Sequence, residues 1–356
     1  MTERARNRCR ERLEILADAD LNPDDARLAA IDELRRAVGF ERWCWPLTDP
    51  QSGLATSGIA QFDLWPSLPR LISLQEHGDI ATKPRLIFGR SPSLALSTET
   101  GGDIERSRAW REVLQPYGIG DTLMTACRER EACWGSVELM RDRDDPAFSR
   151  DEIRLLAGAA STLGTLLRRS LAQSWRHDPD SAEMPPPATL ILDRELAPAG
   201  WTSPVRQWLD ILQPMPGMLP PAIYEIGTRI LAGNVSDLPS GVPARVRIRS
   251  SSGRWSIIEG ALLEGSDEPR VAITMRGATG DEVVDLLCRA YGLTARERRI
   301  VELLRTGLAT KQMSGALGIS AYTVQDHVKA IFEKTGARSR GELISQLTAT
   351  AVRSPD

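Results

Sequence analysis

One short stretch near the C-terminal end carries side chains suited to binding an external partner. From Ile319 to Thr335, Val324, Val328 and Ile331 recur at intervals of four and three residues, which predicts a helix with one apolar face. The outer face holds a phenol, an amide, a carboxylate and an ammonium group, on Tyr322, Gln325, Asp326 and Lys329. In the major groove of DNA, an amide pairs best with adenine, an ammonium with guanine, and a carboxylate accepts from cytosine. The stretch therefore predicts a helix whose outer face can hydrogen-bond to an external partner, with base edges as one candidate.

The charge distribution indicates a polyanionic partner for this part of the chain. From Arg289 to Arg340 there are ten Lys or Arg residues against four Asp or Glu residues, although the whole chain carries a net charge of −3. Three of the four lysines fall in the same segment. A basic segment attached to an acidic body favours nucleic acid as the partner of that segment alone.

The elements that must position the helix are predicted from capping residues. Thr294 and Glu297 form a capping box at the start of a first helix. Thr310 is expected to cap a second helix and Ser320 a third, with Gly318 in the turn between them. A short helix, a turn with glycine and a second helix with a polar outer face form the arrangement of a helix-turn-helix motif.

From about residue 293 to 347 the sequence resembles the LuxR-type, or NarL-type, DNA-binding domain. The matching residues are Leu293, Thr294, Arg296, Glu297, Gly307, Leu308, Lys311, Leu317, Gly318, Ile319, Ser320, Thr323, Val324, His327, Val328, Ile331, Phe332, Lys334, Arg338, Ser339 and Arg340. The resemblance implies an all-α four-helix domain that binds double-stranded DNA. It also implies a bacterial transcriptional regulator, with RNA polymerase as a further partner if the regulator is an activator.

The resemblance also assigns roles to single residues. Gln325, Asp326 and Lys329 are expected to approach bases, and Tyr322 to contact either the backbone or a thymine methyl group. The residues expected to hold phosphates are Thr310, Lys311, Ser320, Thr323, His327, Arg338 and Arg340. Two alternatives stay open, because His327 can pack between helices and Asp326 can pair with Lys329 or a nearby Arg. The family often has Lys at the position of Gln325, so the operator of a Lys-bearing relative is not assumed.

The region ahead of this domain is predicted to form two α+β sensor domains, each with an antiparallel sheet. The predicted divisions are a GAF-like sensor domain at 1–176, a Pro-rich linker at 177–188, a PAS-like domain at 189–278 and the LuxR-type helix-turn-helix domain at 279–356. The linker has three consecutive prolines and no apolar periodicity, which is typical of a stiff extended segment.

The resemblance to GAF and PAS domains rests on the order of elements. Before the linker, the sequence predicts a helix at 25–40, strands at 42–47 and 85–89, a hairpin that turns near Arg130, and a helix capped by Ser149. After the linker, the predicted order is strands, helices and strands again. Both families are sensor folds, so the resemblance implies that the front of the chain receives a signal.

Non-covalent sensing of a small organic effector, in either front domain, is the expected signal. The sequence holds no GxxxxGK[ST], GxSxG or HExxH motif and no plausible Cys–His pair, so neither an enzyme nor an ATP-driven regulator is expected. No metal or cofactor is expected either, although His77 as an axial haem ligand stays an alternative. The residues predicted to line a ligand pocket are Trp43, Trp45, Trp65, Trp110 and Trp134. These rings can also be ordinary core, and the front domains can instead bind a partner protein.

A seam of apolar residues predicts a homodimer. The seam has a spacing of three and four residues and consists of Ile153, Leu156, Ala160, Leu163 and Leu167. The same residues can instead pack on the sheet of their own domain.

No apolar run approaches the roughly 20 residues of a membrane span, and the first residues lack the apolar core of a signal peptide. A cytoplasmic protein without membrane contact is therefore expected.

Overall fold

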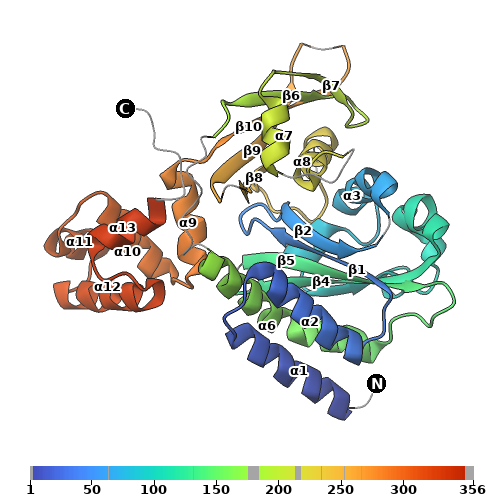
Figure 1. Cartoon of the computed structure of the whole chain (residues 1–356), viewed down its shortest axis with the longest axis horizontal. Coiled ribbons are helices and arrows are strands. Elements are labelled where there is room, and N and C mark those ends of the chain that lie inside the picture. Colours follow the sequence, from blue (N-terminus) through green and yellow to red (C-terminus); the bar gives the residue numbers. More distant parts are fainter. Residues whose placement is uncertain are drawn as a thin grey trace.

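The computed structural model describes residues 3–62, 64–130, 132–174, 184–212, 218–233, 235–251, 253–265 and 267–348. Within these residues, two five-stranded antiparallel sheets are flanked by helices, and a group of helices forms the C-terminal part (Figure 1). The two α+β domains and the all-α C-terminal domain expected from the sequence are therefore confirmed. Most of the predicted linker lies outside the described residues, and the second sheet begins at Ala188, the last residue of that predicted linker.

The first domain consists of helices around one sheet. Its helices are α1 (Glu3–Asp18), α2 (Pro23–Ala37), α3 (Leu68–Glu76), α4 (Lys83–Phe88), α5 (Leu96–Glu99) and α6 (Arg150–Ser174). Its strands are β1 (Arg42–Thr48), β2 (Ala55–Gln61), β3 (Ser93–Ala95), β4 (Ile119–Glu129) and β5 (Ala132–Asp142). Four single turns complete it, at η1 (Trp65–Ser67), η2 (Ile104–Arg106), η3 (Trp110–Leu114) and η4 (Gln115–Tyr117).

The sheet order of this domain is β2-β1-β5-β4-β3, with every pair antiparallel. The hairpin between β4 and β5 is confirmed, and Arg130 in its turn has a φ of 55°. Helices α1, α2 and α6 pack together on one face of the sheet, whereas α3 lies on the other side (Figure 1). Asn22 caps α2, and Ser149 forms the predicted capping box of α6 with Glu152.

The strand predicted at 85–89 is wrong, because these residues belong to α4. Thr82 caps this helix by accepting from the Arg85 N–H at 3.4 Å, and Pro84 occupies its first turn, where a missing N–H costs nothing. An apolar run of three residues fits a helix and a strand equally well. The flanking Thr82 and Pro84 favour the helix, and the edge strand β3 begins five residues after the helix ends.

The apolar seam of α6 is buried within the protomer, so the predicted coiled-coil contact through this seam is wrong. Leu156, Leu163 and Leu167 are at most 2% exposed and belong to the same core as residues of α1, α2 and the sheet. Periodicity predicts an apolar helix face but does not say what covers it. Here α1, α2 and β4 cover the face.

The second domain repeats the sheet order of the first. Its elements are β6 (Ala188–Leu192), β7 (Pro198–Trp201), α7 (Val205–Leu212), α8 (Pro221–Ala232), β8 (Arg245–Arg249), β9 (Trp255–Leu263) and β10 (Arg270–Gly277). The strands lie in the order β7-β6-β10-β9-β8, so in both sheets the first strand pairs with the second and the fifth. Helix α8 packs on β9 and β10 and also contacts α3 and β2 of the first domain (Figure 1).

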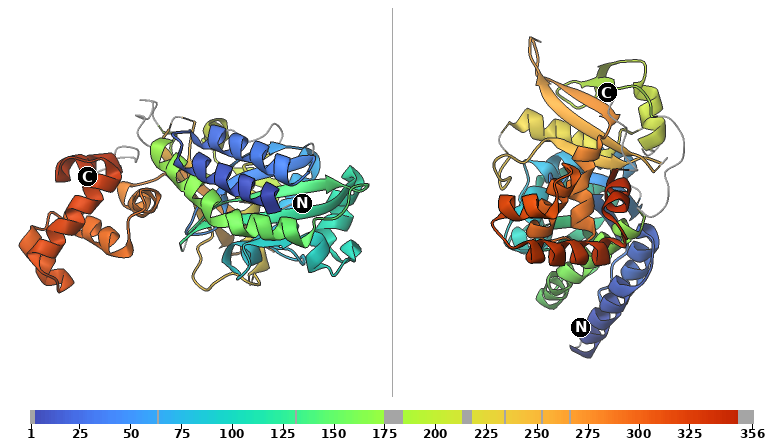
Figure 2. Two further views of the ribbon diagram at one scale, coloured as in Figure 1. Left: turned by 90° about the horizontal axis from the view of Figure 1, so that it is seen from below. Right: turned by 90° about the vertical axis from the view of Figure 1, so that its left-hand side faces the viewer.

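Five helices form the C-terminal part and lie to one side of the two sheets (Figure 2). They are α9 (Gly280–Ala290), α10 (Ala295–Arg305), α11 (Thr310–Leu317), α12 (Ala321–Thr335) and α13 (Arg340–Thr348). Helix α9 contacts α6 of the first domain and α13 of the C-terminal part. Because of these contacts, the core around α6 continues through α9 into the C-terminal helices.

Candidate nucleic-acid interface and ligand cavity

Helices α11 and α12 are joined by a tight turn around a glycine. Gly318 ends α11 in the left-handed region, with φ 63° and ψ 35°, which a residue without Cβ adopts at no cost. Ser320 caps α12, since its hydroxyl accepts from the Thr323 N–H at 3.0 Å. The expected cap of α11 at Thr310 is wrong by one residue, because Ala309 occupies the cap position and Gln312 accepts from its N–H at 2.8 Å.

Helix α12 has the two unlike faces expected from the sequence. Val324, Val328 and Ile331 are buried against the other C-terminal helices. The outer face is exposed, and its residues are Tyr322, Gln325, Asp326 and Lys329, of which Tyr322 is 73% exposed. Lys329 lies 4.0 Å from Glu333, while within the described part of the chain the side chain of Asp326 makes no hydrogen bond or ion pair. The side chain of Asp326 is therefore available to an external donor.

Apart from His327 in the middle of α12, the residues predicted to hold phosphates lie around the starts of three helices. Arg340, at the start of α13, donates from Nη2 to the Thr310 hydroxyl at 2.7 Å, which joins the starts of α11 and α13. The hydroxyls of Ser320 and Thr323 lie 2.9 Å apart at the start of α12. Lys311 and Arg338 are exposed, whereas His327 is half-buried.

A buried carboxylate fixes the orientation of α12 relative to α10. Glu297 is 4% exposed, accepts from the Thr294 N–H at 2.7 Å and also accepts from Lys334 Nζ at 2.8 and 2.6 Å. Although burial alone would raise the pKa of Glu297, the hydrogen bonds from Lys334 and Thr294 lower it below the usual value. The sequence predicted Glu297 only as a cap. Its second partner, Lys334, lies 37 residues away and appears only in the folded chain.

Of the five tryptophans predicted to line a pocket, the four whose side chains the structure describes are buried in the two cores of the first domain. Trp45 is fully buried, Trp43 donates from Nε1 to Gln61 at 3.0 Å, and Trp110 donates to the Ile119 carbonyl at 2.9 Å. Trp134 is buried beside a hollow between the first domain and the start of the C-terminal helices. The side chain of Trp65 lies outside the described part of the chain. Ligand binding by these residues stays a prediction.

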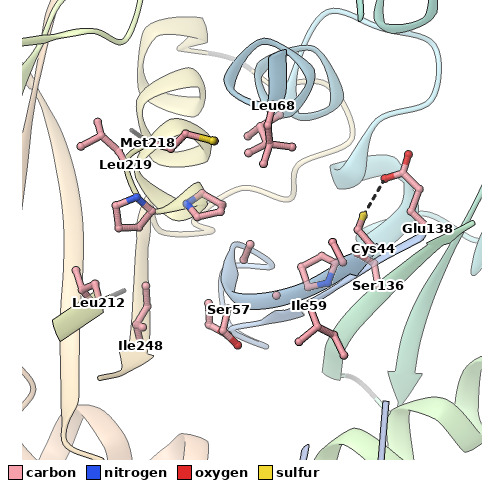
Figure 3. Close-up of a pocket in the computed structure, with 18 of the residues that line it drawn as sticks. Cys44, Ser57, Ile59, Leu68, Ser136, Glu138, Leu212, Met218, Leu219 and Ile248 are labelled. Atoms are coloured by element: carbon pink, nitrogen blue, oxygen red, sulfur yellow. Dashed lines mark hydrogen bonds between the residues drawn. The ribbon is translucent and has the colours of Figure 1, made fainter. Parts of the chain in front are cut away.

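A cavity of about 360 Å³ lies between the first and second domains, and none of the described tryptophan side chains lines it. Its first wall comes from β1, β2, α3 and β5, and its second wall from the end of α7, the residues before α8 and the end of β8. Apolar side chains predominate, as Leu68, Ile59, Leu219 and Ile248 illustrate (Figure 3). His77, considered as a haem ligand, is exposed at the end of α3 and does not line this cavity.

One end of the cavity holds a buried carboxyl group. Glu138 on β5 accepts from Gln75 Nε2 at 3.0 and 3.2 Å and from the Cys44 thiol at 3.7 Å (Figure 3). Burial raises the pKa of Glu138, although the Lys83 ammonium and these two hydrogen bonds act in the opposite direction. The ammonium of Lys83 donates to Glu225 of α8 at 2.6 Å. Burial lowers the pKa of Lys83, but Glu225 more than compensates, so that it is raised overall.

Glu138 and Lys83 were not predicted as site residues, although the sequence contains a signal for each of them. Glu138 is an acid between the apolar residues Val137 and Leu139, and Lys83 is the only lysine outside the C-terminal segment. A second buried pair, Glu76 with Arg229 at 2.6 Å, also crosses between the two domains. Burial raises the pKa of Glu76 to about 7, despite the attraction of Arg229. The interface therefore combines an apolar cavity with buried charge pairs.

The described residues contain neither a membrane-spanning helix nor a cluster of metal-ligating side chains. No helix within them is long and apolar enough to cross a membrane. No group of three or more His, Cys, Asp or Glu side chains in the same residues is arranged to hold a metal ion. The five cysteines are free thiols, and all but the half-buried Cys44 are buried, as expected for small core residues.

The turn between α11 and α12 and the exposed outer face of α12 define a helix-turn-helix protein. The family model described as bacterial regulatory proteins, luxR family, matches residues 292–347. The spore germination protein GerE of Bacillus subtilis (strain 168) is 36% identical over 55 residues, which are 15% of this chain and 74% of GerE. The chain belongs to the luxR family through this C-terminal domain.

Two further comparisons cover longer stretches of the chain at lower identity. The transcriptional regulatory protein DesR of Bacillus subtilis (strain 168) is 29% identical over 96 residues, which are 25% of this chain. The chain thus spans about half the length of DesR, since the match covers 48% of it. The crystal structure of Escherichia coli SdiA is similar over 97% of both chains, with 10% identity and a TM-score of 0.33. Similarity at that level does not establish a shared overall fold.

Proposed function

We propose that this chain is a sequence-specific DNA-binding transcriptional regulator. The observation that carries the proposal is the exposed face of α12, with Gln325, Asp326 and Lys329 on a helix whose other face is buried. The family of the C-terminal domain and the basic charge of 289–340 support it. Under this proposal Thr310, Lys311, Arg338 and Arg340 contact phosphates, while the outer face of α12 contacts base edges.

The front of the chain is proposed to receive a small-molecule signal. The cavity between the two sheets supports this proposal, because its size and apolar walls are typical of sites for small organic molecules. The proposed divisions are a GAF-like domain at 1–176, a linker at 177–188, a PAS-like domain at 189–278 and the DNA-binding domain at 279–356. A homodimer is also proposed, since two copies would contact two half-sites of one operator.

Binding of a partner protein by the front domains is the second candidate. The exposed side chains of Trp201 and Leu262 on the second domain favour it, because each is 54% exposed. Native mass spectrometry of protein purified from its host distinguishes the two candidates. A mass increase of a few hundred daltons would support a small-molecule effector, whereas an additional polypeptide would support a protein partner.

DNA recognition is tested by selecting operators from a pool of randomised duplexes with the full-length chain. We expect a common motif to be enriched and to bind about 10³-fold or more tightly than a scrambled duplex at one salt concentration. A selected pool that binds no better than the starting pool would contradict sequence-specific recognition. Titration of the selected duplex then measures the operator affinity of substituted chains.

A further inference from the structure

The cavity between the front domains has walls from both of them. Cys44, Ile59 and Leu68 come from the first domain, whereas Leu212 and Ile248 come from the second, and their side chains face one another across the cavity (Figure 3). A molecule bound here would contact both domains at once. Its binding free energy would therefore depend on how the two domains are placed, which a site inside one domain would not require.

The carboxyl group of Glu138 is the polar feature of the first wall. Its hydrogen-bond donors are neutral, namely the Gln75 amide and the Cys44 thiol. The nearby cation, Lys83, donates to Glu225 instead, at 2.6 Å. A carboxylate has about four acceptor positions, so Glu138 retains capacity for a further donor from the cavity.

Two cations also line the cavity: Lys83 on the first wall, which is paired with Glu225, and Arg249 on the second wall. Arg249 on β8 donates from Nε to the Gly253 carbonyl at 3.0 Å. Its chain neighbour Ile248 lies across the cavity from Glu138 (Figure 3). Because the Lys83 ammonium is hydrogen-bonded to Glu225, the Glu138 carboxyl group remains the acceptor at its end of the cavity, and this end favours a positively charged or hydrogen-bond-donating group. The apolar side chains between the two walls favour an apolar body.

We propose that this cavity is the binding site of a small apolar amine, whose ammonium group donates to Glu138 and whose apolar body lies between the two domains. The inference rests on the proposed function only in taking the front domains as ligand sensors. The ammonium supplies the carboxylate with a charged donor in direct contact, and a charge-assisted hydrogen bond in a low-dielectric site is stronger than a neutral one.

The test is isothermal titration calorimetry of the full-length protein with three probes that share one skeleton: phenylbutylamine, phenylbutanol and phenylbutanoate. We expect the amine to bind about ten-fold more tightly than the alcohol, and the acid to bind most weakly. In Glu138→Gln, the amine should lose this advantage while the alcohol binds as before. In the matched control Glu112→Gln, which changes an exposed carboxylate of the same domain, the order should stay as in the wild type.

A variant of the second wall tests the location independently of how Glu138→Gln folds. Ile248→Ala should weaken all three probes by a similar factor, because it removes apolar contact without changing charge. Equal affinities of amine and alcohol in the wild type, or no measurable binding of the amine, would overturn the proposal. Unchanged affinities in Ile248→Ala would contradict the proposal that the second domain forms part of the binding site.

A DNA titration with the amine present tests the proposed function separately. If the amine binds but the affinity for the operator does not change, ligand control of DNA binding is contradicted, while the binding site itself is not.

Discussion

Arg247 on β8 holds both carboxylate oxygens of Asp49, which lies 198 residues earlier in the chain. Its Nε and Nη2 donate at 2.8 and 2.6 Å, and its backbone N–H donates to the same carboxylate at 3.0 Å. Its Nη1 donates to the Glu282 carbonyl in the first turn of α9 at 3.2 Å. A single side chain therefore joins the first domain, the second domain and the helix that leads to the DNA-binding domain.

Loss of the Asp49 carboxylate should be costly, because both side chains of the pair are only 2% exposed. Asp49→Ala leaves a buried guanidinium without its counter-charge, so the free energy of unfolding should fall by about 3–5 kcal/mol. Urea denaturation of the full-length chain, followed by tryptophan fluorescence, measures this. Asp145→Ala, at an exposed position, serves as control and should change stability by less than about 0.5 kcal/mol. Equal effects of the two substitutions would contradict a structural role for the pair.

Gln325→Ala should reduce affinity for the selected operator by about 1–3 kcal/mol and leave the affinity for a scrambled duplex nearly unchanged. The reason is that an amide on the exposed face of α12 contributes only where the matching base is present. Fluorescence anisotropy titrations of both duplexes at one salt concentration measure the difference. A similar loss on both duplexes would show that Gln325 contacts the backbone or the protein instead.

Asp326→Ala should have the opposite effect on the scrambled duplex. Removing an unpaired carboxylate from a surface that faces a polyanion should strengthen non-specific binding, while discrimination at one base pair is relaxed. The same anisotropy titration, repeated with operators changed at single base pairs, measures both effects. Weaker binding to every duplex would mean that Asp326 has a structural role.

Lys311→Ala should weaken binding to operator and scrambled duplex alike, and should lower the salt dependence by about one ion. Lys311 is exposed beside Thr310 at the start of α11, where the predicted phosphate contacts gather. Titrations at several salt concentrations give the slope. Arg194→Ala, which removes an exposed charge from the second domain, should leave the slope unchanged. An unchanged slope in Lys311→Ala would show that this residue does not meet a phosphate.

Thr279 and Glu282 form a capping box at the start of α9, and this box should make the free energy of unfolding depend on pH in the acid range. Hydrogen bonds from Arg276 and from the Thr279 backbone lower the pKa of Glu282 to about 2, against the effect of burial. Because the folded-state pKa lies below the usual 4.5, the contribution is fully present above about pH 4.5 and is lost as the pH falls towards 2. The difference in unfolding free energy between wild type and Glu282→Gln should therefore shrink over that range. A constant difference would exclude this linkage.

The sequence by itself determined the DNA-binding domain, because the signals for it are local. The capping pair Thr294 and Glu297, the cap Ser320 and the left-handed Gly318 each act within a few residues of chain. The apolar face of α12 also follows from spacing alone. The two sheets were recognisable from the order of strands and helices, since hairpins such as the one at Arg130 join neighbours in sequence.

Tertiary structure decided the features that depend on residues far apart in the chain. The α6 seam could have faced a second copy or its own sheet, and only packing showed that α1, α2 and β4 cover it. The cavity brings Glu138 and Ile248 to one space, and the pair Lys83 and Glu225 joins residues 142 positions apart. Periodicity reports which side of an element is apolar or polar. It carries no information on which distant element will meet that side, because that choice is made by the packing of whole domains.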